Sequence, residues 1–321
     1  MTPSVKTTIK HAAMKYDLLA MGEGMVEFNQ TVPGQPHYTQ GFGGDTSNAV
    51  IAAARAGVRC GYVSAVGDDT FGQFLIDLWQ LAGIESSPIA IESGATTGIY
   101  FVTHGVAGHE FSYRRADSAA ARMHLNDVQS QALQQTRWLH YSGISQAISE
   151  AAREQCAAAV RIAHSAGSKI SFDSNLRLKL WSLQDARLHM IPAIASCDLF
   201  LPSLDDVVHL SGLTDPQAIL RWSHDLGAKL VVLKMGEQGV LVSDGEQQQR
   251  IAPIRVKAVD ATGAGDCFAG NLLARLALGD ELIQAARYAN AAAALSVQGF
   301  GAVQPLPLPS AVKDLLAAQA S

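Results

Sequence analysis

The chain has 321 residues and a mass of 34.0 kDa, with 48% hydrophobic and 17% charged residues, so it is long enough to bury a large core. Its net charge of -5 and pI near 6.0 exclude the broad basic face of a general nucleic-acid or membrane-surface binder. No apolar run reaches the roughly 18 residues that cross a bilayer, and the cysteines lack metal-ligand spacing, so we expect a cytoplasmic globular protein without a membrane partner.

Residues 1–15 carry lysines but no apolar run of about 7 to 15 residues, as a secretory signal would, so we predict a flexible leader. Short apolar runs then alternate with segments of helical period, a pattern typical of a mostly parallel sheet with helices on both faces. Strands are predicted over residues 16–22, 60–67, 137–143, 168–173, 197–202 and 229–236, and helices over 46–57 and 149–167. We predict one α/β domain over residues 16–310 and a C-terminal tail over 311–321.

Residues 26–41 and 97–115 break this rhythm, because they alternate apolar and polar residues around Pro-Gly, His-Gly and Ala-Gly turns. This alternation predicts half-exposed β-hairpins. We expect the two segments to form a small β layer that projects from the main domain. Since such a layer exposes strand edges, we also predict a homodimer formed through it.

The stretch GFGGDTSNAVIAAARAG at residues 41–57 places glycines before a predicted helix whose first turns carry Asp45 and Asn48. Gly57 is suited to end that helix as its C′ residue. On this stretch alone, a glycine-rich connector followed by a helix cap explains the residues as well as a ligand site does.

The motif DATGAGD at residues 260–266 lies where a strand is predicted to turn into a helix. Residues 251–260 alternate in the manner of a strand, and Phe268 and Leu272 begin a helical repeat that ends at Gly279. The free amides and the positive dipole end of a first helical turn attract anions, and glycines let a phosphate approach the backbone.

Asp266 in this motif has two interpretations. It is either a first-turn carboxylate that favours the helix dipole, or a catalytic group beside a phosphate. A carboxylate next to an anion site repels phosphate, and proteins tolerate such a cost mainly where chemistry needs it. We therefore predict that Asp266 is a general base that takes a proton from a hydroxyl attacking phosphorus.

The two glycine-containing stretches together resemble the two signatures of the ribokinase family of carbohydrate kinases, G-G-x-x-x-N-x-A and D-x-x-G-A-G-D. Gly43, Gly44 and Asn48 match the first, with Val50 in place of the usual Ala, and residues 260–266 match the second. The segments VGDDTFG and KMGEQG match further parts of the family, and the resemblance extends over residues 16–308. It implies a three-layer α/β/α sandwich with a β-sheet lid over a sugar site.

The resemblance also implies an ATP-dependent sugar kinase that uses Mg²⁺, and it assigns roles to matching residues. Asp266 becomes the catalytic base, and the anion hole is formed by the amides of Gly263, Ala264 and Gly265. The residues implied to bind the sugar include Glu27, Gly43, Gly44, Asp45 and Asn48, and those along the ATP site are Lys234, Gly236, Gly239 and Asn290.

One position departs from the family pattern. The family often has N-x-x-E after the strand at residues 197–202, where this chain has Ser203 and Asp206. We predict that Ser203 contacts the nucleotide and that Asp206 acts on the metal ion through water. The alternative is that both are solvated residues at a helix start.

The segment DSNLRLKLW at residues 173–181 indicates which class of sugar the predicted kinase phosphorylates. Within the family, D-x-N-x-R followed by L-W resembles the 2-keto-3-deoxygluconate kinases, whose Arg meets the substrate carboxylate, and Arg177 occupies that place. Tyr113 and Arg115 in SYRRADSAA, and Tyr100 in TGIY, also resemble those kinases. Taken singly, Arg177 is also explained as a surface arginine, and each tyrosine as lid packing.

The prediction from sequence is therefore a kinase that phosphorylates an acidic keto sugar, 2-keto-3-deoxygluconate, at its 6-hydroxyl. The alternatives are a fructokinase-like enzyme for a neutral ketose and a sugar-binding protein that has lost transfer.

Overall fold

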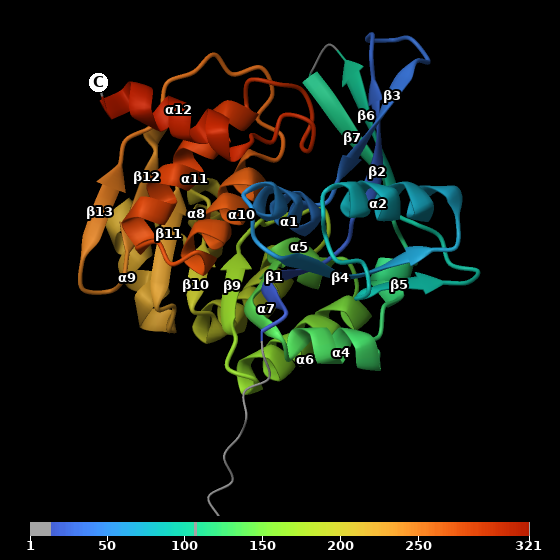
Figure 1. The fold of residues 1–321 in the computed structure, drawn as a ribbon, viewed down its shortest axis with the longest axis horizontal. Helices are drawn as coiled ribbons and strands as arrows, with labels where there is room; N and C mark the ends of the chain where they lie inside the picture. The colour runs from blue at the N-terminus through green and yellow to red at the C-terminus, as the bar shows by residue number, and fades with distance from the viewer. Residues whose placement is uncertain (1–13, 106–107, 321) are drawn as a thin grey trace, which may run out of the picture.

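The computed structural model describes residues 14–105 and 108–320, and its centre is a large, mostly parallel sheet between two helical layers (Figure 1). The sheet contains, in order across it, β13 (Gln248–Ile251), β12 (Val240–Ser243), β11 (Leu230–Lys234), β10 (Leu199–Leu201), β9 (Lys169–Asp173), β8 (Thr136–Ser142), β1 (Tyr16–Met21), β4 (Cys60–Gly67) and β5 (Ile89–Glu92). Neighbours from β11 to β5 are parallel, while β12 and β13 pair antiparallel. The predicted α/β/α sandwich is confirmed.

The central strands are buried on both faces because they carry nearly continuous apolar residues. Successive side chains of a strand point to opposite faces, so Leu18 and Ala20 of β1 join one core, and Leu19 and Met21 join the other. Each helical layer covers one of these cores.

The helices of the first layer are α1 (Asp45–Arg55), α2 (Thr70–Leu81), α10 (Ala264–Ala277), α11 (Leu282–Ser296) and α12 (Pro309–Ala320). Those of the second layer are α3 (Ala119–Arg122), α4 (Asp127–Leu133), α5 (Gly143–Ala147), α6 (Glu150–Ser165), α7 (Leu183–Ser196), α8 (Leu204–Ser211) and α9 (Pro216–Leu226). A short 3₁₀ turn, η1 (Gly236–Gln238), follows β11. In the described part of the chain, no helix is long and apolar enough to cross a membrane.

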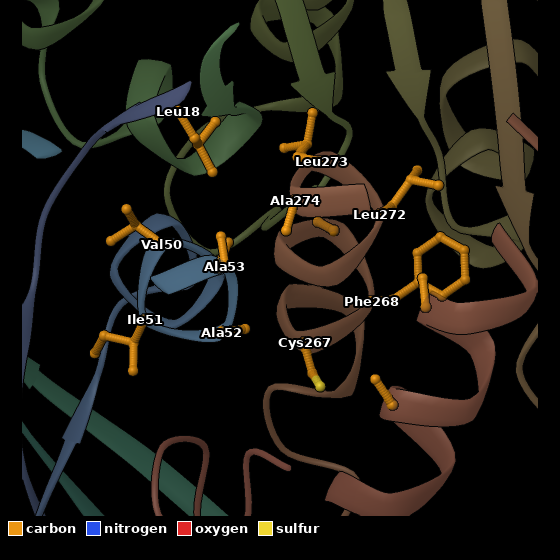
Figure 2. Close-up of a cluster of buried hydrophobic side chains, with 14 of the residues drawn as sticks. Leu18, Val50, Ile51, Ala52, Ala53, Cys267, Phe268, Leu272, Leu273 and Ala274 are labelled. Atoms are coloured by element: carbon orange, nitrogen blue, oxygen red, sulfur yellow. The ribbon is translucent and has the colours of Figure 1, made fainter. Parts of the chain in front are cut away.

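Helices α1 and α10 lie against one another through small side chains, which Figure 2 shows around Ala53 and Ala274. A Cβ on Gly270 of α10 would lie 2.0 Å from the Ala49 carbonyl oxygen of α1, so only glycine permits this approach. The close packing sets the starts of the two helices side by side, and these starts carry Asp45, Asn48 and Asp266.

The predicted β layer is present as a second sheet of order β3 (Tyr38–Gly43), β2 (Met25–Gln30), β6 (Ile99–Gly105) and β7 (Gly108–Arg114). It projects from the main body beside α1 and α2 (Figure 1). β2–β3 and β6–β7 are hairpins, and β2 joins β6 in parallel. The turn of the second hairpin, at residues 106–107, lies outside the described residues. We call this second sheet the lid.

Two predictions about local structure are wrong. Residues 252–260 form no strand despite their alternation, because β13 ends at Ile251 and the amides of Val259 and Asp260 donate to the Val297 carbonyl after α11 instead of to a neighbouring strand. Residues 311–320 are not a tail but most of α12, whose Val312 is fully buried against the first core. The predicted leader lies outside the described residues up to residue 13.

Candidate functional site

The glycine turn, residues 260–266, leads into α10 with amides directed away from the helix. Gly263 has a φ of 74°, and a Cβ there would lie 2.8 Å from Cβ of Ala302, so glycine is required. The first intrahelical bond runs from the Cys267 amide to the Gly263 carbonyl, at 2.8 Å, which leaves the preceding amides of the first turn to other partners. The Ala264 amide already donates to the Ala261 carbonyl at 3.2 Å, contrary to its predicted place in the anion hole.

Asp260 holds the glycine turn in shape. Its carboxylate accepts hydrogen bonds from the Thr262 amide at 2.9 Å and from the Thr262 hydroxyl at 2.6 Å. Its second oxygen accepts from the Gly301 amide at 2.9 Å. The first acidic residue of the motif therefore has a structural role.

Asp266 is tied to α1 through Asn48, whose side-chain amide donates to Oδ2 of Asp266 at 2.8 Å. The amide oxygen Oδ1 of Asn48 is buried and has no hydrogen-bond partner among the described residues. A buried acceptor without a partner is costly, so a donor such as a substrate hydroxyl fits beside it. The two residues come from the two predicted motifs, 218 positions apart in the sequence.

The environment of Asp266 makes it a better base than an ordinary carboxylate. Burial raises its pKa to about 7, and the nearby carboxylates of Asp45 and Asp173 act in the same direction. The hydrogen bond from Asn48 and the charge of Lys234 oppose this rise. A pKa near neutral pH is the value that general-base catalysis favours.

A group of polar residues ends β9 beside this carboxylate. Asp173 forms a largely buried ion pair with Lys234 at the end of β11. Burial raises the pKa of Asp173 even though the charge of Lys234 opposes the shift. The side-chain amide of Asn175 donates to Asp45 at 2.7 Å, and Asn175 holds an unusual φ of 28°. The parallel strands β9 and β11 thus place Asp173 and Lys234 together at the carboxyl ends of the strands.

Several residues predicted for the ATP site already make hydrogen bonds within the protein. Ser203 is the N-cap of α8, and its hydroxyl accepts from the Asp206 amide at 3.2 Å. Asp206 accepts from the Ser174 hydroxyl at 2.8 Å. Asn290 on α11 donates to the Ala252 carbonyl at 3.0 Å.

The glycines after β11 differ from one another. A Cβ on Gly239 would lie 2.2 Å from the Ile251 carbonyl oxygen, so this glycine is needed for packing against β13. Gly236 has a φ of 54° and open space around the position of its missing Cβ. Only Gly236 leaves room for a ligand.

The lid carries Glu27 and Tyr100 as a buried pair, in which the Tyr100 hydroxyl donates to Glu27 Oε2 at 2.6 Å. Burial raises the pKa of Glu27. A Cβ on Gly43 would lie 2.3 Å from the Tyr100 hydroxyl, so glycine in β3 makes room for this pair. Tyr113 stacks on Tyr100 with ring centroids 5.6 Å apart.

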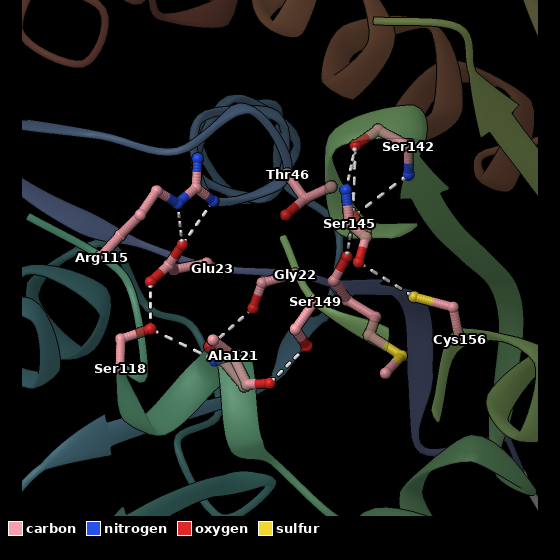
Figure 3. Close-up of polar contacts among 12 residues, drawn as sticks. Gly22, Glu23, Thr46, Arg115, Ser118, Ala121, Ser142, Ser145, Ser149 and Cys156 are labelled. Atoms are coloured by element: carbon pink, nitrogen blue, oxygen red, sulfur yellow. Dashed lines mark hydrogen bonds and ion pairs between the residues drawn. The ribbon is translucent and has the colours of Figure 1, made fainter. Parts of the chain in front are cut away.

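Arg115 does not have the free guanidinium that the sequence predicts for a substrate carboxylate. Its Nε donates to Glu23 at 2.7 Å, and the Ser118 hydroxyl donates to the other oxygen of Glu23 at 2.6 Å (Figure 3). Glu23 is only 3% exposed, so removing Arg115 would strand a buried carboxylate. Arg115 therefore joins the lid hairpin to the end of β1.

Arg177 is exposed and lies near the lid. One of its nitrogens donates to the neighbouring Leu176 carbonyl at 2.9 Å. The positive charges of Arg115 and Arg177 both lower the pKa of Tyr113, against a larger effect of burial that raises it. The guanidinium of Arg177 is therefore close enough to the lid for its charge to act on Tyr113.

An open cavity of about 490 Å³ adjoins the lid on the side of α2. Ile99, Tyr113, Arg114 and Arg115 are among the residues that line it, so it shares lid residues with the predicted sugar site. Asp266 does not line this cavity, so it is distinct from the glycine turn.

The sequence reasoning missed Glu23 and Asp173 as functional candidates. Asp173 is the last residue of the buried strand β9, and Glu23 lies two residues after the buried strand β1. Both lay inside segments chosen for other residues, Arg177 and Glu27. An acidic residue at the carboxyl end of a fully buried parallel strand was the available signal.

Comparisons with known proteins agree with this geometry. The model of the family described as pfkB family carbohydrate kinase matches residues 10–309. The probable fructokinase-7 of Arabidopsis thaliana is 33% identical, covering 95% of this chain and 93% of that protein. The 2-dehydro-3-deoxygluconokinase of Thermoproteus tenax is 34% identical, covering 94% of each.

Solved structures show the same fold. A putative ribokinase II from E. coli, in its apo form, has a TM-score of 0.87 and 27% sequence identity, covering 94% of this chain and 99% of that one. A putative ribokinase II from E. coli in complex with ATP and Mg²⁺ has a TM-score of 0.86 and 27% sequence identity, covering 94% of this chain and 99% of that one. Fold, motifs and family model coincide over nearly the whole chain, which belongs to the pfkB family of carbohydrate kinases.

Proposed function

We propose that this protein transfers the γ-phosphoryl group of ATP to the 6-hydroxyl of 2-keto-3-deoxygluconate, also called 2-dehydro-3-deoxygluconate. The observation that carries phosphoryl transfer is the position of Asp266, one residue beyond Gly265 and hydrogen-bonded to Asn48. A base of raised pKa next to open helix-start amides suits a hydroxyl that must lose a proton as it attacks phosphorus.

The proposed step moves one proton to Asp266 and exchanges one phosphorus–oxygen bond for another. Asp266 accepts the proton of the 6-hydroxyl while the hydroxyl oxygen forms a bond to the γ-phosphorus. The bond between that phosphorus and the β,γ-bridging oxygen breaks, and ADP leaves with its electron pair. The amides of Gly263 and Gly265 are proposed to face the transferring group, and the oxygen of Asn48 to orient the sugar.

Mg²⁺ fits this site as an ion that arrives with the nucleotide. Within the described residues, no group of three or more His, Cys, Asp or Glu side chains is placed to hold a metal ion by itself. Mg²⁺ commonly keeps several waters and binds through substrate phosphates with one or two carboxylates, and Asp206 offers such a carboxylate at the edge of the site. When bound, Mg²⁺ would neutralise phosphate charge.

Arg177 supports an acidic sugar as the acceptor. The site is otherwise rich in carboxylates, namely Glu27, Asp45, Asp173 and Asp266, which disfavour an anion without a nearby cation. Arg177 is exposed, and its charge acts on Tyr113 of the lid. A planar guanidinium can hold a carboxylate through two parallel hydrogen bonds.

A fructokinase-like activity on a neutral ketose is the second candidate. It is favoured by the engagement of Arg115 with Glu23, which leaves Arg177 as the only arginine of the predicted pair available to a carboxylate. Fructokinases of several organisms are as similar to this chain as the gluconate-type kinase is. A panel of sugars assayed by ADP release separates these two activities, and no release with any sugar identifies a binding protein.

We expect Arg177→Ala to lower kcat/KM for 2-keto-3-deoxygluconate by about 10- to 150-fold, because one charge-assisted interaction of about 1.5 to 3 kcal/mol is lost. Fructose, which carries no carboxylate, should lose little. Arg177→Lys should restore only part of the activity, since a point charge does not reproduce the planar guanidinium. Steady-state kinetics with both sugars measure this.

The matched control is Arg161→Ala, which removes an exposed arginine from α6 on the second helical layer. It should leave both sugars unaffected. A parent enzyme that prefers fructose, or an Arg177→Ala variant that loses both substrates equally, would refute the carboxylate role and establish the fructokinase-like activity.

We also propose that the lid forms a homodimer. Its edge strand β3 begins with exposed residues, among them Tyr38 at 39% exposure, and such unpaired edges favour pairing with another chain. Sedimentation equilibrium at micromolar concentration should give twice the chain mass of 34.0 kDa. A monomer at that concentration would contradict the dimer.

The four buried free thiols agree with the expected cytoplasmic location.

A further inference from the structure

Lys234 is a cation set among carboxylates beside the glycine turn. Its Nζ pairs with Asp173, and a Cβ built on Gly265 would lie 3.5 Å from the same Nζ. In the proposed function, the transferring phosphoryl group lies against Gly265. The ammonium of Lys234 therefore stands where negative charge accumulates during transfer.

The strand geometry explains how this pair forms. Asp173 ends β9 and is aligned with Leu201, the last residue of the short strand β10. Lys234 ends β11, and its amide donates to the Pro202 carbonyl at 2.8 Å. The two side chains thus meet across the end of β10. Only 15% of the Lys234 side chain and 7% of that of Asp173 are exposed, so water screens their charges weakly.

The pair is also part of the electrostatic surroundings of Asp266. The titratable groups that face Asp266 are Asp45 on α1, Asp173 on β9, Lys234 on β11 and Tyr100 on the lid strand β6. Asp45 and Asp173 raise the pKa of Asp266, and Lys234 lowers it. The two members of the ion pair therefore act on the base in opposite directions.

We propose that Asp173 is a positioning residue for phosphoryl transfer: it holds the Lys234 ammonium beside Gly265, where the transferring phosphoryl group is proposed to lie. This inference rests on the proposed function, because it needs Asp266 to accept the proton. Asp173 itself touches neither substrate nor phosphate. Its effect on the reaction passes through Lys234 and through its charge.

The test is the pH dependence of kcat at saturating Mg-ATP, with whichever sugar the parent enzyme phosphorylates best. Asp173→Asn removes a charge that raises the pKa of Asp266, so the acidic limb of the profile should move to lower pH. Lys234→Met removes a charge that lowers it, so the limb should move to higher pH. A unit charge roughly 10 Å away shifts a partly buried group by about one pH unit.

The plateau value of kcat, at pH values where Asp266 is ionised, measures how much the position of the Lys234 ammonium contributes to transfer. We expect Lys234→Met to lower the plateau kcat by about 10²- to 10³-fold, the usual cost of losing one group that stabilises transition-state charge. Asp173→Asn should lower it by about 10- to 100-fold, because the ammonium remains but is no longer held in place. Titration of ATP itself is common to every variant and cancels in the comparison.

A second ion pair, at the amino ends of β10 and β11, provides the matched control. Lys229 pairs with Asp198 at 2.6 Å, at the opposite ends of β11 and β10 from the glycine turn. Asp198→Asn should change neither the plateau nor the acidic limb. The double variant Asp173→Asn with Lys234→Met leaves no unpaired buried charge, so it remains informative if a single variant does not fold. Its limb should lie near that of the parent, and its plateau should stay low.

Limbs that move in opposite directions, with lowered plateaus, support the inference. It is overturned if both limbs stay in place, if they move in the same direction, or if the double variant keeps the parent plateau. Asp266→Asn separates this failure from that of the proposed function. An active Asp266→Asn enzyme overturns both, whereas an inactive one with unmoved limbs overturns only the role of Asp173.

Discussion

Asp266→Asn should lower kcat by about 10²- to 10⁴-fold, the usual range for loss of a general base. The substitution keeps the side-chain volume and the start of α10, and its amide oxygen can still accept the hydrogen bond from Asn48. It removes only the ability to take the proton of the attacking hydroxyl. Single-turnover kinetics with saturating sugar and Mg-ATP would measure the loss, while the dissociation constant of ATP should change little.

Thermal unfolding of the same variant gives an independent check with a definite sign. The pKa of Asp266 is raised in the folded protein from 3.8 to about 7, so its ionisation costs stability. That stability is fully present below pH 3.8 and is lost as pH rises through about 7. The asparagine variant does not ionise, so it should melt at a higher temperature than the parent at pH 8, and the difference should shrink toward pH 4.

These two results together exclude a misfolded variant. A protein that melts later and yet turns over far more slowly has lost chemistry and not structure. If the variant kept near-normal turnover, Asp266 would be a first-turn carboxylate that favours the helix dipole, and the mechanism would be wrong.

Gly265→Val should lower kcat/KM for ATP by about 10²- to 10³-fold, as expected when an amide of an anion hole is blocked. A Cβ at this position meets only Lys234 Nζ, at 3.5 Å, so the backbone accepts a side chain without strain. The methyl groups of valine would then occupy the space in which the phosphoryl group is proposed to approach the amide. Alanine should cause a smaller loss.

The Gly265→Ala variant supplies the control for folding. Alanine in place of glycine inside a helix commonly stabilises it by about 0.5 to 1 kcal/mol, so this variant should unfold at higher denaturant concentration while its activity falls. Gly263 is less suitable for this experiment. Its φ of 74° and the proximity of Ala302 mean that any side chain there strains the fold as well as the site. Full activity of Gly265→Val would rule out an anion hole at this turn.

The sequence by itself determined the layers of the fold and the position of the glycine turn at the start of a helix. Strands such as residues 60–67 are almost entirely apolar because both faces are buried. The helices between the strands repeat their apolar residues with the helical period. The lid hairpins were predictable because half-exposed strands must alternate. Asp266 was predictable because two glycines and a carboxylate at a helix start have few structural explanations.

Two segments were predicted wrongly because contacts distant in the sequence decide their structure. Residues 252–260 alternate like a strand, but a strand forms only beside another strand, and the pairing with β12 ends at Ile251. The amides of Val259 and Asp260 donate to the Val297 carbonyl after α11 instead. Residues 311–320 seemed to be a tail because a short amphipathic segment has little helical stability alone. Burial of Val312 against the first core stabilises α12.

Only the tertiary structure decided which charged groups are free to act. The sequence treated Arg115 and Arg177 alike, yet one is committed to buried Glu23 and the other is exposed near Tyr113. It also gave no means to pair Asp173 with Lys234, because they lie 61 positions apart and meet only where three parallel strands end together. Electrostatic energy depends on the distance between charges in space and on the exclusion of water, and both depend on the tertiary structure.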